Sequence, residues 1–73
     1  LETDRIRLAE QDGAPVGFAR LGPVSLPVEP AGHALELRQL YLDDRAKGTG
    51  VADMLMRWAI DATRADGADE LFL

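Results

Sequence analysis

Residues 36–52 read ELRQLYLDDRAKGTGVA, and the change of pattern within this stretch decides the fold. Its first residues complete a run over 34–42 that predicts a β-strand, apolar on both faces toward its end and therefore buried on both sides there. The polar residues 43–50 predict a loop. From Val51 to Ala65 apolar residues recur at helical spacing, and Asp66-Gly67 predicts the helix end. A strand, a loop and a helix therefore follow one another directly.

Upstream of this stretch the sequence predicts a β-hairpin. Residues 3–11 alternate in polarity, with Ile6 and Leu8 on one face, which is typical of a half-buried strand. Asp12-Gly13 predicts a tight turn, because glycine accepts a positive φ without steric cost. Residues 16–21 then predict the second strand, antiparallel to the first.

The remaining segments complete the predicted architecture. Residues 22–34 hold three prolines, which predict a surface loop, because proline has no N–H to give to a neighbouring strand. Leu71 begins a further strand, expected to lie parallel to 34–42. The predicted fold class is α/β (α+β), with a mixed, largely antiparallel sheet and a βαβ unit around one long helix.

We expect residues 1–73 to form one partial domain, with antiparallel strands in 1–42 and the loop, helix and next strand in 43–73. The apolar residues at both ends of the chain favour part of a longer domain, because natural termini are usually polar and loosely held.

Composition narrows the class of partner. Eight Lys and Arg stand against thirteen Asp and Glu, a net charge of −5, which argues against binding to nucleic acid or to an anionic membrane. The absence of Cys excludes disulfides and thiolate metal sites, and the single histidine, His33, predicts no metal site. No apolar run approaches the roughly 18 residues of a membrane span, and no signal-peptide pattern appears. The expected location is the cytoplasm.

The loop RAKGTG at residues 45–50 predicts an anion-binding site. The first amides of a helix have no partner within the helix, and together with the helix dipole they attract an anion. Gly48 and Gly50 allow the backbone to approach that anion closely, while Arg45 and Lys47 add positive charge. The spacing differs from that of a Walker loop and from GxGxxG.

This loop also matches the (Gln/Arg)-x-x-Gly-x-(Gly/Ala) signature of the GNAT superfamily of acyl-CoA-dependent N-acyltransferases, and the chain resembles that superfamily over nearly its whole length. The hairpin resembles its second and third strands, residues 34–42 its fourth strand, and residues 51–73 its third helix and the start of its fifth strand. The resemblance implies a partial GNAT fold.

The resemblance also implies a set of site residues. Backbone amides of the loop bind the pyrophosphate of coenzyme A, and the end of the fourth strand pairs with the pantetheine arm. The implied cofactor-binding residues are Leu40, Tyr41, Leu42, Arg45, Ala46, Lys47, Gly48, Thr49, Gly50 and Val51. The Leu40 amide is the implied donor to the oxyanion. Glu36 stands where several members carry a general base, and its alternative role is structural or substrate-orienting. The family's general acid, a Tyr of a later helix, has no counterpart in this chain.

The implied activity is that of an N-acetyltransferase, with acetyl-CoA as cosubstrate and no metal. A primary amine attacks the thioester directly. The implied partners are acetyl-CoA and the amine, with neither nucleic acid nor membrane, and the resemblance admits a homodimer. Two alternatives stay open, a non-catalytic acyl-CoA-binding or regulatory module and an unrelated α/β phosphate-binding domain. The acceptor amine and the acyl length cannot be read from the sequence.

Overall fold

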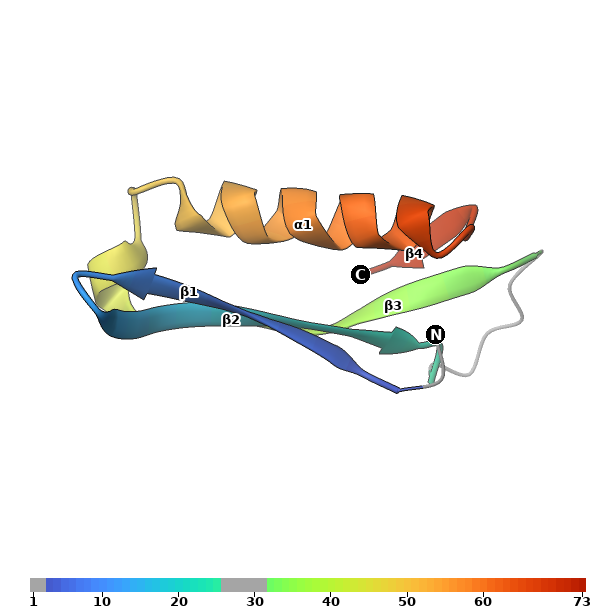
Figure 1. Ribbon diagram of the computed structural model, residues 1–73, viewed down its shortest axis with the longest axis horizontal. Coiled ribbons are helices and arrows are strands. Elements are labelled where there is room, and N and C mark those ends of the chain that lie inside the picture. Colours follow the sequence, from blue (N-terminus) through green and yellow to red (C-terminus); the bar gives the residue numbers. More distant parts are fainter. Residues whose placement is uncertain (1–2, 26–31) are drawn as a thin grey trace.

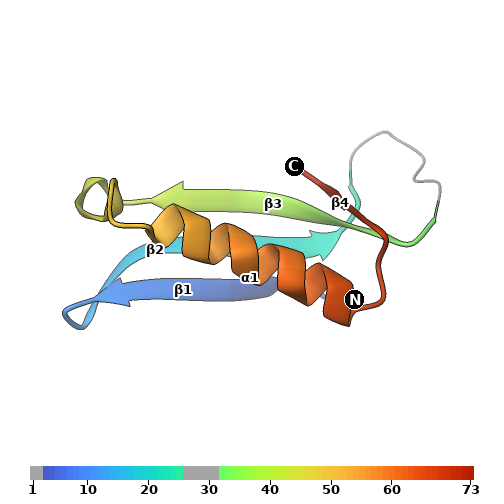
Figure 2. The same cartoon turned by 90° about the horizontal axis from the view of Figure 1, so that it is seen from above.

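The computed structural model describes residues 3–25 and 32–73 as a sheet with one long helix lying across a single face (Figures 1 and 2). Residues 26–31, part of the predicted proline-containing loop, lie outside the described residues. The elements in chain order are β1 (Arg5–Gln11), β2 (Ala14–Pro23), β3 (Ala34–Leu42), the 3₁₀ turn η1 (Asp44–Ala46), α1 (Val51–Ala65) and β4 (Glu70–Phe72).

The strands are ordered β1-β2-β3-β4 in one sheet. β1 and β2 are antiparallel, as are β2 and β3, whereas β4 runs parallel to β3. The mixed, largely antiparallel sheet and the βαβ unit of β3, α1 and β4 are therefore confirmed. Asp12 and Gly13 form the β1–β2 turn with φ values of 51° and 79°, which is the backbone that a two-residue hairpin turn requires.

The helix α1 has the bounds that the sequence predicts, and its buried residues join it to the sheet. Leu55 and Ala59 are fully buried, and Trp58 packs against both apolar clusters beneath the helix. Thr63 is also buried, which apolar periodicity does not predict. Its hydroxyl donates to the Ala59 carbonyl at 2.7 Å, so its burial leaves no polar group unpaired.

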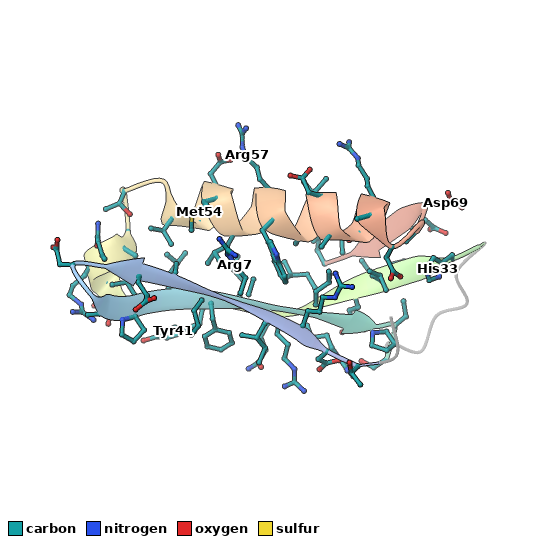
Figure 3. The ribbon with its side chains drawn as sticks, in the orientation of Figure 1. Arg7, His33, Tyr41, Met54, Arg57 and Asp69 are labelled. Atoms are coloured by element: carbon teal, nitrogen blue, oxygen red, sulfur yellow. The ribbon has the colours of Figure 1, made fainter. Side chains whose placement is uncertain are left out.

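The apolar face predicted for β1 proves to be the exposed one. Ile6 and Leu8 are 60% and 58% exposed, whereas Ala9 is buried. Figure 3 shows Arg7 on the side of the sheet that faces α1. The prediction of a half-buried Ile6–Leu8 face was wrong, because α1 covers the opposite face and Leu8 lies across from Phe18 on the uncovered one.

The strand β3 is buried at its beginning and exposed toward its end, the reverse of the prediction. Arg20 of β2 pairs with Gln39 and the next residue pairs with Leu37, so Arg38 is an extra residue that forms a β-bulge. A bulge interrupts the alternation of faces and bends its strand. Beyond it, Leu40 and Tyr41 are 40% and 54% exposed.

Candidate functional site

The loop between β3 and α1 is anchored to the sheet at its first residues. The Asp43 amide donates to the Val16 carbonyl of β2 at 2.8 Å, and the Asp43 carboxylate accepts from the Arg45 amide at 3.0 Å. The Ala46 side chain is buried in the apolar cluster that contains Leu55. These contacts fix the beginning of the loop relative to β2 and to the helix, so the loop has a defined shape.

The two glycines of the loop adopt a left-handed backbone beside open space. Gly48 has a φ of 78° and Gly50 a φ of 87°, and a Cβ built at either position meets no heavy atom within 4 Å. Gly50 is the N-cap of α1 and makes no side-chain cap. The first helical hydrogen bond runs from the Met54 amide to the Gly50 carbonyl, so the amides of 51–53 have no helical acceptor.

The amides of the loop divide into two groups. Those of Ala46, Lys47 and Thr49 donate to carbonyls within the loop, at 2.9, 3.2 and 3.2 Å, and the Arg45 amide is held by Asp43. The amides of Gly48, Gly50 and Val51 meet no acceptor among residues 3–25 and 32–73. Together with the amides of Ala52 and Asp53, which also lack an acceptor in this part of the chain, they make five unpaired donors where the helix dipole is positive, which favours an anion.

The basic side chains of the loop are paired with acids. The Arg45 guanidinium contacts the Asp43 carboxylate at 3.2 Å and the Pro15 carbonyl at 3.3 Å, and Lys47 Nζ lies 2.9 Å from Asp44 Oδ1. Hydrogen bonds from the Arg45 side chain and amide hold the pKa of Asp43 below its usual range. The positive potential for a ligand therefore comes mainly from the backbone.

The outer edge of β3 has donors and acceptors that no strand of the described chain uses. Phe18 and Tyr41 are directly opposite each other, and the Asp43 amide bonds to Val16. Because antiparallel pairs alternate, the N–H and C=O groups of Leu40 and Leu42 point away from β2. β4 pairs only with Ala34–Glu36. We call residues 37–42, on the side away from β2, the open edge of β3.

Tyr41 does not belong to this edge through its backbone, which faces Phe18 of β2. Its ring stacks on that of Phe18 with centroids 5.8 Å apart, on the uncovered face of the sheet.

Glu36 is a buried acid near the beginning of β3, only 7% exposed. Its Oε1 accepts from the Ser25 amide at 2.7 Å and from the Ser25 hydroxyl at 3.0 Å, and the hydroxyl lies 3.3 Å from Oε2. Four strand positions, roughly 13 Å at the usual rise, separate it from Leu40. The structure therefore brings the loop and the end of β3 together, and sets Glu36 farther along the strand.

Ser25 is the residue of this region that sequence reasoning missed. It lies just after β2 in the proline-containing segment, and no spacing or motif marks it. Only the folded chain brings it to Glu36.

His33 pairs with Asp66 just beyond the C-terminal end of α1, with His33 Nε2 2.9 Å from Asp66 Oδ2. In the described ranges, no three His, Asp or Glu side chains gather where a metal ion would be held. Within the described residues, no helix is long and apolar enough to span a membrane.

Comparison with known proteins finds one matching family and several solved structures with a similar fold. The model of the Acetyltransferase (GNAT) family matches residues 2–73. The ribosomal-protein-alanine N-acetyltransferase of Brucella melitensis biovar Abortus 2308 superposes with a TM-score of 0.74 at 25% identity, over 96% of this chain and 50% of that one. AAC(6')-Iy, solved with the bisubstrate analogue CoA-S-monomethyl-acetylneamine, superposes with a TM-score of 0.78 at 18% identity, over 93% of this chain and 48% of that one.

The IAA acetyltransferase of Bacillus cereus ATCC 14579 gives a TM-score of 0.72 at 21% identity, over 90% of this chain and 40% of that one. The chain thus spans about half the length, or somewhat less, of these solved structures. No curated protein sequence matches it significantly.

Proposed function

This chain belongs to the GNAT acetyltransferase family, and we propose that it transfers an acetyl group from acetyl-CoA to a primary amine by direct attack on the thioester. One observation carries the proposal. The unpaired amides of Gly48, Gly50 and Val51 lie at the positive end of α1, immediately after the open edge of β3. An anion-binding loop that follows an unpaired strand edge suits a ligand with a pyrophosphate and a long amide-containing arm.

The pyrophosphate is assigned to the loop 45–50 and the helix start. The amides of Gly48, Gly50 and Val51 donate to its oxygens, and the left-handed glycines leave room for it. Arg45, Ala46, Lys47 and Thr49 shape this part of the loop, because their own amides are already held within it. Arg45 and Lys47 also line its mouth.

The pantetheine arm is assigned to the open edge of β3, where the Leu40 carbonyl and the Leu42 backbone groups pair with its amides and Tyr41 holds the strand to β2. When bound, acetyl-CoA supplies an acetyl group activated as a thioester. The Leu40 N–H, which points away from β2, donates a hydrogen bond to the thioester oxygen as negative charge develops on it.

Glu36 is assigned as the general base. A protonated primary amine, with a pKa of about 10 if it resembles lysine, must lose a proton before it attacks. Glu36 is buried and lies four strand positions from Leu40, so it receives that proton through water rather than by direct contact. The net charge of −5 favours a cationic amine as the acceptor.

The test is calorimetric titration with acetyl-CoA, followed by measurement of thiol release in the presence of a panel of primary amines. Saturable binding and amine-dependent thiol release are the expected results. Binding without thiol release with any amine would instead identify a non-catalytic acyl-CoA-binding module. Equal binding of nucleotides or phosphate, with no preference for coenzyme A, would refute the assignment of the loop.

A further inference from the structure

Ser25 gives Glu36 two hydrogen-bond donors at a single carboxylate oxygen. Its amide lies 2.7 Å from Oε1 and its hydroxyl 3.0 Å from the same atom. The two donors come from one residue, located eleven positions earlier and just beyond the end of β2. Since the amide is part of the backbone, its direction is set by the fold, and the carboxylate is oriented against a fixed point.

The burial of Glu36 makes these donors important. A carboxylate with 7% exposure has lost most of its hydration, which disfavours its charged form. Hydrogen bonds donated to the charged form act in the opposite direction. A general base must be unprotonated when the amine arrives, so whatever keeps this buried carboxylate ionised keeps it competent.

Among the described residues, the charged groups that lie near Glu36 on its face of the sheet are an aspartate and two arginines, which pair with one another. Gly22 lies across from Glu36, and the Asp4 carboxylate lies against Gly22. Asp4 is itself paired with Arg20 at 2.5 Å and with Arg38 at 2.9 Å. On the other side, Glu36 is in register with Phe72 of β4, which carries no charge.

We propose that Ser25 is the positioning residue of Glu36, holding its carboxylate ionised and oriented so that it accepts the proton from the acceptor amine. This inference rests on the proposed function, in which Glu36 is the general base. Ser25 does not touch the reacting atoms and acts only through Glu36.

The test uses Ser25→Ala, which removes the hydroxyl and keeps the amide, and Ser25→Thr, which keeps both donors. Thr63→Ala is the control for the loss of a hydrogen-bonded hydroxyl elsewhere in the protein, because its hydroxyl donates to the Ala59 carbonyl within α1 and not to Glu36. The first readout is the titration of the Glu36 carboxyl carbon by NMR, which needs no activity. In Ser25→Ala we expect the titration midpoint to rise by about one pH unit, the scale of one hydrogen bond to a charged group. Ser25→Thr should keep the wild-type midpoint, and Thr63→Ala should leave the midpoint unchanged.

The second readout is the pH dependence of kcat/KM. In Ser25→Ala the acidic limb of the profile moves to higher pH by the same amount. At pH values on this limb kcat/KM falls about tenfold, whereas on the plateau at higher pH it changes little. An effect confined to folding would lower activity equally at all pH values. Glu36 titration curves that superimpose in Ser25→Ala and the wild type would overturn the inference.

Failure of the proposed function gives a different pattern. A wild-type protein that releases no thiol with any amine refutes that function whatever the titration of Glu36 shows. If the wild type is active and Glu36→Gln keeps the full kcat/KM, Glu36 is not the base, and the positioning role of Ser25 is refuted with it. If Glu36→Gln strongly lowers kcat/KM but the pH profile of Ser25→Ala is unchanged, the result contradicts the role of Ser25 and leaves that of Glu36 in place.

Discussion

Replacing Gly48 by aspartate places a negative charge beside the unpaired amides of the loop. Gly67, which follows α1, offers a matched position. Gly48 and Gly67 both have a φ of 78°, and a Cβ built at either one meets nothing within 4 Å. A non-glycine residue in this backbone region costs roughly 1–2 kcal/mol, and aspartate is among the residues that tolerate it. Gly48→Asp and Gly67→Asp therefore carry the same charge change and a similar backbone cost, at opposite ends of one helix. The helix dipole favours the new charge at position 48 and disfavours it at position 67, each by roughly 0.3–1 kcal/mol, so Gly67→Asp is expected to be the less stable of the two.

The expected loss of affinity follows from Coulomb's law. For an added carboxylate about 5 Å from one phosphate charge, the repulsion is about 0.8 kcal/mol at the dielectric constant of water and about 3 kcal/mol at an effective value of about 20. Gly48→Asp should therefore weaken binding of coenzyme A by about 4-fold to about 150-fold. Gly67→Asp should bind within about twofold of the wild type, because screening removes most of the effect of a charge farther away than about 10 Å.

The assay is calorimetric titration with coenzyme A at low and high salt, with thermal unfolding of both variants as the folding control. The defect in Gly48→Asp should shrink as salt rises, because salt screens an exposed charge. Equal affinities in the two aspartate variants, with both variants folded at the temperature of the titration, would refute the assignment of the pyrophosphate to this loop.

Three further predictions concern the frame of the site. Leu55→Ala should lower the free energy of unfolding by about 2–5 kcal/mol, measured by denaturant titration, because Leu55 is fully buried between the helix and the sheet. Gly17→Ala should destabilise the protein and reduce kcat, since its Cβ would lie 2.7 Å from the Tyr41 carbonyl oxygen and push the end of β3 away; unchanged stability would contradict this. The hydrogen bond from His33 lowers the pKa of Asp66, so the contribution of this pair to stability is present above the ordinary Asp value of about 3.9 and is lost as the pH falls through the lowered value. Asp66→Asn should therefore lose stability near neutral pH and differ little from the wild type in strong acid, as followed by thermal unfolding across that range.

What the sequence predicts well is what local chemistry determines. The helix bounds at Val51 and Ala65 follow from apolar spacing and from Gly67 at the C-terminal end, and all of these signals lie within one segment. The turn at Asp12-Gly13 is equally local. The membership of the loop in a strand–loop–helix unit was also predictable, because the change of periodicity is abrupt there.

What the sequence cannot predict depends on other segments. The choice of covered face for β1 depends on where α1 packs, and the Ile6–Leu8 alternation carries no information about that. The bulge at Arg38 arises from the register with β2, so the exposure of Leu40 and Tyr41 could not be read from periodicity. The contact of Ser25 with Glu36 joins two residues that no motif links.

The open edge of β3 has a consequence for the behaviour of the protein in the absence of ligand. A strand edge with unused N–H and C=O groups is a template for another chain as well as for a small molecule. Beside it lie the exposed side chains of Leu40 and Tyr41. Ligand-free protein at high concentration should therefore self-associate through added strands, and coenzyme A should act as a solubilising agent by occupying the edge first. Bound ligand would therefore suppress aggregation by covering the strand edge, and purification in its presence should improve the yield of monomer.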